Sequence, residues 1–396
     1  MKIGPQSFVP ELVALVLLLG LPLLGVLAGK LPIERYLEFP PLSQYVEHRP
    51  FAWPVFFLSA ILILGVMLPF LIRVLRPQRQ TADELSSYVR PLAAASLPRN
   101  QRRFPVWGWL GIGFGLIVWV LAWTRFDWFA PLQRHTFSPL WVGYIITVNA
   151  LTWRRTGACM LTRRPCYFFL LFPVSALFWW FFEYLNRFVQ NWHYVGTDLL
   201  SPLEYFIYAT LPFATVLPAV MGTCDLLATY PRLYAGLSSC WPITWARPRP
   251  TAFISLIVCA CGLAGLGLLP NYLFPLLWLA PLGILASIQV LARRTTLLAE
   301  CRRGDWRQVF LLAISALICG FFWEMWNYNS LAKWVYTVSF VNRFHIFEMP
   351  VLGYAGYLPF GLECALVADR VAAWCERSSR GRSRTRQQEG VAASLC

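Results

Sequence analysis

Residues 175–213 read SALFWWFFEYLNRFVQNWHYVGTDLLSPLEYFIYATLPF, and residues 315–360, SALICGFFWEMWNYNSLAKWVYTVSFVNRFHIFEMPVLGYAGYLPF, repeat the same order of polar residues. Each stretch has an acid and an amide three positions apart, so the two side chains share one face of a helix. The pairs are Glu183 with Asn186 and Glu324 with Asn327. A Trp-x-Tyr unit, a second acid and Leu-Pro-Phe follow in both stretches: Trp192, Tyr194, Glu204 and 211–213, then Trp334, Tyr336, Glu348 and 358–360.

The composition is that of an integral membrane protein. Of the 396 residues, 58% are hydrophobic and only 13% are charged, whereas ordinary globular chains carry about 25% charged residues. Several uncharged runs approach or exceed the roughly 18 residues that cross a bilayer. The net charge of +15 does not indicate a nucleic-acid partner, because the arginines cluster in alternate loops, as they do in cytoplasmic segments. Membrane lipids are the predicted partners.

The apolar runs predict an all-α polytopic membrane bundle. If the N-terminus is cytoplasmic, every loop that falls inside is basic, as the positive-inside rule requires. We therefore expect a multi-pass protein of the cell inner membrane with both termini in the cytoplasm. The sequence predicts about ten transmembrane helices, at 8–27, 52–72, 107–124, 138–153, 166–186, 203–227, 251–269, 272–291, 308–327 and 350–369.

An internal repeat is predicted beyond the two polar stretches. Residues 154–156 (RRT) precede 163–164 (RR), and residues 293–295 (RRT) precede 302–303 (RR) at the same offset. Each unit would hold four spans, and an even number preserves orientation, so the units would form a tandem parallel repeat. The predicted divisions are a two-span leader (1–72), a basic cytoplasmic linker (73–106), repeat unit 1 (107–230), repeat unit 2 (251–370) and a basic cytoplasmic tail (371–396).

The predicted topology puts the acids and amides of both stretches near the outer face, where we expect them to gather. A carboxylate within a span costs about 2.5–3.5 kcal/mol on insertion scales, so it usually faces a protein interior or a cavity. Such a cluster suits general acid–base catalysis or a proton-coupled carrier. Alternatively, the acids lie among the lipid headgroups and only bind loop amides. The predicted catalytic residues are Glu183, Glu204, Glu324, Glu348, Asn186 and Asn327.

Aromatic residues crowd these acids. Trp and Tyr belts are common at membrane interfaces, but aromatic faces also stabilise cations, including a carbocation intermediate, by cation–π attraction. Apolar walls of this kind would suit a hydrophobic small-molecule substrate, a lipid or an isoprenoid. The predicted substrate-binding residues are Trp180, Trp192, Tyr194, Trp323, Trp334 and Tyr336.

No cofactor and no metal site is predicted. His48, His135, His193 and His345 fall in segments predicted to lie outside, where interfacial hydrogen bonding is their expected role. His345 and Glu348 would share a face if that stretch were helical, and imidazole with carboxylate ligands is the metal-binding alternative. The sequence has no Gly-rich phosphate loop, no serine nucleophile elbow and no Walker pattern.

The repeated pattern resembles the small membrane lycopene cyclases of the carotenoid pathway. Their repeated unit has an acid late in one helix, a Trp-x-Tyr-like stretch and a Pro-x-Glu-Glu at the next helix. Glu183, Trp192 with Tyr194, and 202–204 (PLE) match in that order, although position 205 is Tyr rather than a second acid. The resemblance covers under a quarter of the chain. It implies acid-initiated cyclisation of a polyene, with carboxyl groups donating and removing protons and aromatic rings shielding the cation.

Three functions are consistent with the sequence. The first is an acid–base enzyme, of the cyclase or isomerase kind, that acts on a lipid or isoprenoid. The second is a carrier coupled to protons or cations, since parallel repeats and acids within spans are also features of transporters. The third is a membrane scaffold without catalytic activity, whose aromatic outer face docks a partner.

Overall fold

The computed structural model describes residues 8–76, 102–197, 199–244, 246–294 and 296–393, with side chains as far as residue 377. These residues are mostly helical, with two short pairs of strands. The all-α prediction is therefore confirmed. Most of the predicted basic linker, 77–101, lies outside the described residues.

The helices follow the apolar runs of the sequence, and several begin with proline in the first turn, where its missing N–H costs nothing. The principal helices are α1 (Val9–Ala28), α3 (Trp53–Leu75), α5 (Val106–Trp123), α6 (Phe137–Thr156), α8 (Pro165–Val189), α9 (Pro202–Phe213), α10 (Val216–Leu227), α11 (Pro248–Ala264), α13 (Leu276–Leu291), α14 (Arg307–Tyr328) and α15 (Tyr357–Ala393). Short helical turns connect them: α2 (Glu34–Leu37), η1 (Asp127–His135), α7 (Met160–Arg163), η2 (Pro231–Leu233), η3 (Ala235–Leu237), α12 (Pro270–Leu273), η4 (Glu300–Arg303) and η5 (Val351–Gly356).

Seven segments of the described chain are helical, long enough and apolar enough to cross a membrane, so the structure is that of a multi-pass membrane protein. They include α9 and α10 together, as one segment at Pro202–Leu227. The predicted number was ten. Of the other three, α11 and α13 have 17 and 16 residues, and α6 carries two arginines in its last turn.

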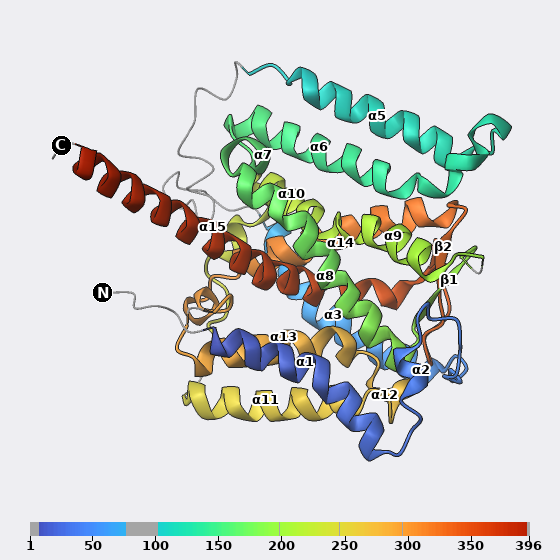
Figure 1. Cartoon of the computed structure of the whole chain (residues 1–396). Coiled ribbons are helices and arrows are strands. Elements are labelled where there is room, and N and C mark those ends of the chain that lie inside the picture. The colour runs from blue at the N-terminus through green and yellow to red at the C-terminus, as the bar shows by residue number, and fades with distance from the viewer. Residues whose placement is uncertain (1–7, 77–101, 198, 245, 295, 394–396) are drawn as a thin grey trace.

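The helices lie side by side, with the two termini at the same end of the bundle (Figure 1). Helices α5 and α6 pack on each other along one flank, and α1, α11 and α13 pack together along the other. Between them lie α8, α10, α14 and α15, which contact one another. Because α1 packs against α8, α11 and α13, the N-terminal segment is part of the main bundle.

The contact between α5 and α6 depends on small residues. Added to Gly143 of α6, a Cβ atom would lie 2.9 Å from the backbone of Gly115 on α5. Gly111 also lies on α5, and a Cβ atom added to it would lie 2.5 Å from the side chain of Ile146 on α6. Close backbone approach of this kind is the usual role of small residues spaced four apart between membrane helices.

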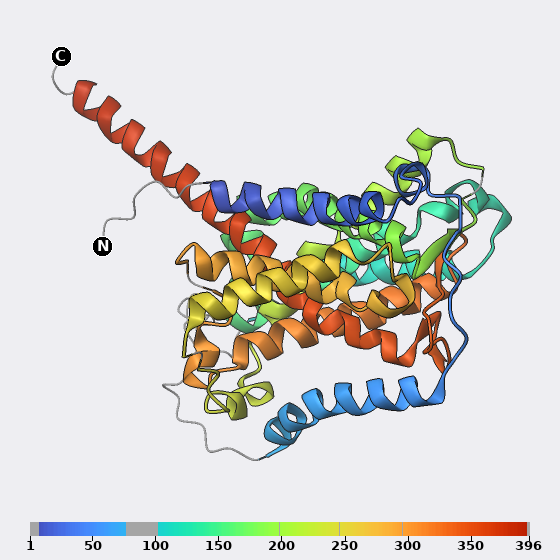
Figure 2. The ribbon, with the colours of Figure 1, turned by 90° about the horizontal axis from the view of Figure 1, so that it is seen from below.

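Helix α3 is set apart from the rest of the bundle, along its lower side in Figure 2. None of its residues is buried. Near its end, Arg73 donates to the carbonyl of Ser239 at 2.9 Å, and Phe70 contacts the rings of Trp241 and Trp306. At its start it follows an extended segment, in which the Ala52 amide donates to the Phe340 carbonyl. This helix is therefore held at its ends.

Two short strands join the two polar stretches, in segments that lie between the predicted transmembrane helices. Strands β1 (Trp192–Val195) and β2 (Lys333–Tyr336) pair in antiparallel fashion, with Trp192 opposite Tyr336 and Tyr194 opposite Trp334. A local twofold axis through the pair His193–Val335 would exchange the two tryptophans and the two tyrosines. The second pair, β3 (His345–Ile346) with β4 (Met349–Pro350), forms a tight hairpin. The 345–348 stretch is thus not helical.

Candidate functional site

The first buried acid lies near the end of α8. Oε1 of Glu183 accepts hydrogen bonds from Nε1 of Trp179 at 2.9 Å, from Nε1 of Trp192 at 3.1 Å and from the hydroxyl of Tyr194 at 2.6 Å. Trp179 comes from the same helix, one turn earlier, whereas Trp192 and Tyr194 come from β1. The strand therefore folds back over the helix end and supplies two of the three donors.

The second buried acid occupies the matching place on α14. The hydroxyls of Tyr336 and Tyr357 both donate to Oε1 of Glu324, each at 2.7 Å. Trp334 does not reach the carboxyl, because its Nε1 donates to the Tyr336 hydroxyl at 2.9 Å. Glu324 is fully buried. Each stretch thus brings a tyrosine of its own strand to its own glutamate.

The two amides hold the strands against the helices. Nδ2 of Asn186 donates to the carbonyl of Trp192 at 2.7 Å, and its Oδ1 accepts from the Trp192 amide at 3.4 Å. Asn327 binds the backbone of Trp334 in the same way, at 2.8 and 2.9 Å. Both amide side chains are buried. Their contacts are those of positioning residues, which fix the strand that carries the aromatic donors.

The strand tyrosines remain hydrogen-bond donors at neutral pH. Burial raises the pKa of the Tyr194 hydroxyl well above its usual value, and the nearby Glu183 carboxyl raises it further. The same two causes, burial first and then the Glu324 carboxyl, raise the pKa of Tyr336. A phenol has an ordinary pKa near 10. Both hydroxyls are therefore protonated and donate to the carboxyls.

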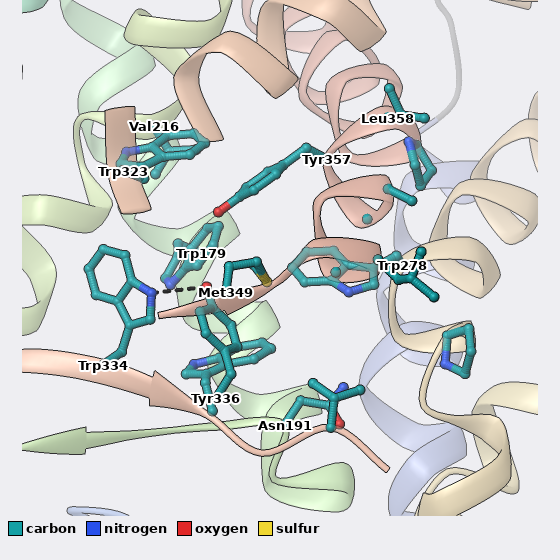
Figure 3. Close-up of a pocket in the computed structure, with 18 of the residues that line it drawn as sticks. Trp179, Asn191, Val216, Trp278, Trp323, Trp334, Tyr336, Met349, Tyr357 and Leu358 are labelled. Carbon is teal, nitrogen blue, oxygen red and sulfur yellow. Dashed lines mark hydrogen bonds between the residues drawn. The ribbon is translucent and has the colours of Figure 1, made fainter. Parts of the chain in front are cut away.

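A large apolar cavity of about 770 Å³ lies on the other side of these aromatic residues. Figure 3 looks into it and shows Trp179, Trp323, Trp334, Tyr336 and Tyr357 around the space. The two carboxyls do not line the cavity. They are reached through the tyrosine hydroxyls, whose rings form part of its wall.

Helix α3 forms the opposite wall of the cavity. Its lining residues include Leu62, Val66, Met67 and Phe70. Because α3 is one of the candidate membrane spans and none of its residues is buried, its other faces are left for lipid. The cavity therefore lies between this candidate membrane span and the main bundle.

Five of the six predicted substrate-binding residues line this cavity: Trp192, Tyr194, Trp323, Trp334 and Tyr336. Trp180 does not. It packs α8 against α9, with its Nε1 donating to the hydroxyl of Thr210 at 3.0 Å and its ring stacked on Phe206.

Glu204 does not join the buried acids. It lies in the first turn of α9, where it forms a capping box with Ser201: its carboxylate accepts from the Ser201 amide at 2.8 Å and hydroxyl at 2.7 Å. Its side chain is exposed. The sequence S-P-L-E at 201–204 carries this signature of a helix start. The expectation that all four acids gather at one place therefore does not hold for Glu204.

Glu348 lies in the turn of the second hairpin and pairs with Lys333, whose Nζ donates to its carboxylate. Both side chains are partly exposed. Its neighbour His345 contacts Asn342 at 3.2 Å. In the part of the chain that the structure describes, no group of three or more histidine, cysteine or acidic side chains is placed to hold a metal ion.

Sequence reasoning left Tyr357, Trp179 and Trp278 out of the predicted site residues. Tyr357 immediately precedes Leu-Pro-Phe at 358–360, but the corresponding position in the first stretch is Thr210. A search for residues shared by the two stretches therefore passes over it. Trp179 donates to Glu183 from one turn back, a spacing that was readable from the sequence. Trp278 comes from α13, outside the two polar stretches, and it stacks on Trp192 with the ring centroids 6.0 Å apart.

Comparisons of the chain with family models, with curated proteins and with solved structures find no match.

Proposed function

We propose that this membrane protein binds an elongated apolar molecule, a lipid or an isoprenoid, in the cavity beside α3 and rearranges it by acid–base catalysis. The observation that carries the proposal is the pairing of Glu183 and of Glu324 with tyrosines that line the cavity. Tyr194 bonds to Glu183 at 2.6 Å, and Tyr336 and Tyr357 bond to Glu324 at 2.7 Å. The hydroxyls would relay protons between the carboxyls and the ligand.

The cavity supports this class of ligand by its size and its lining. Ligand pockets have volumes of about 300–1,000 Å³, and the cavity measures about 770 Å³. Its walls are aromatic and aliphatic, and its position beside α3 favours a ligand that arrives from the bilayer. A water-soluble substrate would find few polar partners away from the tyrosines.

The proposed reaction is an isomerisation or cyclisation without a change of mass. The tyrosine hydroxyl turns from the carboxyl toward a carbon–carbon double bond and gives it its own proton, while it takes up the proton of the carboxyl. Two O–H bonds break, at the carboxyl and at the tyrosine, and one O–H bond, at the tyrosine, and one C–H bond form. The resulting carbocation is held against the faces of Trp179, Trp323 and Trp334, which stabilise it by cation–π attraction. Loss of a proton from a neighbouring carbon restores a double bond, and that proton returns to a carboxylate.

An internal repeat would give two sites that share one cavity. The acid–amide pairs, the strand contacts and the ladder register of the two stretches correspond residue by residue. We include in the proposal that residues 107–230 and 251–370 are parallel repeats. We also propose an inner-membrane location with both termini in the cytoplasm.

The test compares membranes that contain wild-type protein with membranes that contain Glu183→Gln or Glu324→Gln. These changes keep the size of the side chain and remove the transferable proton. We expect a product in the lipid and pigment profile of wild-type membranes and at least a hundredfold less with either variant, the usual contribution of a general acid or base. Glu204→Gln is the matched control, because glutamine also completes a capping box.

The proposal fails if both variants are as active as wild type, or if Glu204→Gln is the variant that loses activity. Equal amounts of each protein in the membrane, with equal melting temperatures, exclude a folding defect as the cause. Movement of a lipid across proteoliposomes under a pH gradient, without conversion, would instead support the carrier. The position of α3, beside the cavity, favours the carrier as the second candidate function.

A further inference from the structure

A second cavity lies beside the first buried acid and has a different character. It measures about 300 Å³, and its lining includes Ser43, Gln44, His48, Glu183, Arg187 and His193. The extended segment between α2 and α3, the end of α8 and strand β1 contribute these residues. Ser43 and Gln44 are exposed at its rim. We call this space the polar cavity.

The polar cavity and the apolar cavity share a wall. Trp192 and Tyr194 line both, whereas Glu183 lines only the polar one. Oε1 of Glu183 is occupied by three donors. The carboxyl therefore lies between a polar space and a tyrosine whose ring faces the apolar space.

Glu183 and Glu324 differ in their access to the polar cavity. Glu183 is 7% exposed and Glu324 is 0% exposed. Oε2 of Glu324 is enclosed and has no hydrogen-bond partner among the described residues. Glu324 lines neither of the two cavities described above. The Glu183 carboxyl thus lines the polar cavity, and the Glu324 carboxyl does not.

Hydrogen bonds from several elements hold the polar cavity in shape. Oε1 of Gln190 accepts from the amides of Tyr45 and Val46, both at 2.8 Å, and its Nε2 donates to the Ser43 carbonyl at 2.8 Å. His48 contacts the Gln190 carbonyl at 3.0 Å and the Ser339 hydroxyl at 3.2 Å. The wall is therefore built by specific contacts.

The charges around the polar cavity are balanced. Arg187 pairs with Glu38 at 3.1 Å and donates to the Arg35 carbonyl at 2.5 Å. Burial lowers the pKa values of His48 and His193, so both imidazoles are neutral at neutral pH. Several ionisable groups surround Glu183. Arg187 comes from α8, His193 and Tyr194 come from β1, and Tyr205 comes from α9. Glu38, Tyr45 and His48 come from the 38–48 segment.

We propose that the polar cavity is a water-filled passage through which Glu183 exchanges protons with the aqueous phase, while Glu324 is closed to that phase. The inference rests on the proposed acid–base function and gives its two acids different tasks. A cavity of about 300 Å³ has room for several waters at roughly 30 Å³ each, and its polar lining offers them partners. Protons used on the ligand would enter and leave through Glu183.

The test is chemical labelling of the purified full-length protein in lipid nanodiscs. The probe is a water-soluble carbodiimide with taurine as the amine, and mass spectrometry measures the label at each glutamate. We expect Glu183 to be modified at least about tenfold faster than Glu324, because an enclosed group reacts only during local opening of the structure. Membrane-soluble dicyclohexylcarbodiimide should reduce this difference.

A pair of variants tests the route. Gln44→Trp would fill the rim of the polar cavity and should slow the labelling of Glu183 severalfold. Leu42→Trp is the matched control, because Leu42 is exposed on the same segment and does not line the cavity. The proposal is overturned if Glu183 and Glu324 are labelled at equal rates in the wild-type protein, or if Glu183 is not labelled. It is also overturned if Glu183 is labelled at equal rates in the two variants. Labelling needs no substrate, so its result is independent of whether the proposed reaction occurs.

Discussion

Asn186 and Asn327 show how single residues organise this site. Each lies one helical turn after a buried acid, and each binds the backbone of the tryptophan that begins the Trp-x-Tyr unit. The spacing of acid and amide therefore has a structural reason: the acid receives the aromatic donors, and the amide fixes the strand that carries them. Sequence reasoning placed both residue types on one helix face and grouped the amides with the catalytic acids, as residues that orient the acids or the substrate.

Asn327→Ala should destabilise the protein more than an exposed substitution. It removes two hydrogen bonds and leaves the N–H and C=O of Trp334 without the side chain that binds them, a loss of about 2–3 kcal/mol. We expect a lower melting temperature in detergent and weaker activity. Asn329→Ala, at an exposed position near the end of the same helix, is the control. Equal melting temperatures for the two variants would contradict the positioning role.

The half-buried imidazole of His48 predicts a pH dependence of stability. Burial lowers the pKa of His48 in the folded protein, so the unfolded state takes up the proton more readily. Stability should therefore fall as the pH drops below the ordinary value of about 6.5, and continue to fall toward the lower folded pKa. At pH values above the folded and the unfolded pKa of His48, the imidazole is neutral in both states and contributes no pH dependence.

Thermal melting between about pH 7.5 and pH 5.5 measures this effect across the ordinary histidine range. The wild-type protein should lose more stability over this interval than His48→Gln does, because glutamine does not titrate. His345→Gln serves as the comparison, since His345 is exposed. A His48→Gln protein with an unchanged pH dependence would mean that another group is responsible.

At the scale of elements, the sequence predicts the helices better than the contacts between them. Apolar runs alone are enough to place α1, α3, α5 and α14 close to their observed bounds. Strands β1 and β2 were missed because each has four residues and becomes regular only by pairing with a segment distant in the sequence. The pairing of Lys333 with Glu348 likewise depends on the hairpin that brings them together.

Helix α3 should control the space available to the ligand. Met67→Trp would place a large ring in the cavity from the α3 side, and we expect it to lower the amount of apolar ligand that copurifies with the protein. Ile61→Trp is the matched control, because Ile61 lies on the same helix, is 66% exposed and does not line the cavity. Native mass spectrometry in mild detergent measures the bound ligand, and equal occupancy would contradict this role for α3.

At the scale of the whole molecule, the two polar stretches meet through β1 and β2 and lie at one end of the bundle, while both termini lie at the other (Figure 1). Composition and arginine placement predicted a polytopic membrane protein. They could not predict that Glu204 would cap a helix and that Glu348 would pair with a lysine, because capping and ion pairing are decided by local and tertiary geometry. Glu204 and Glu348 occupy similar positions in the pattern, yet one caps a helix and the other binds a lysine.

Transfer of a solvent proton to carbon is the step on which the proposed function depends, and its most direct test is isotopic. Membranes that contain the protein are incubated in D2O with an apolar lipid extract, and the products are analysed by mass spectrometry. We predict a product with the mass of its substrate in H2O and one non-exchangeable deuterium in D2O, absent with Glu324→Gln. A product without deuterium, or one whose mass in H2O differs from that of the substrate, would contradict acid–base rearrangement.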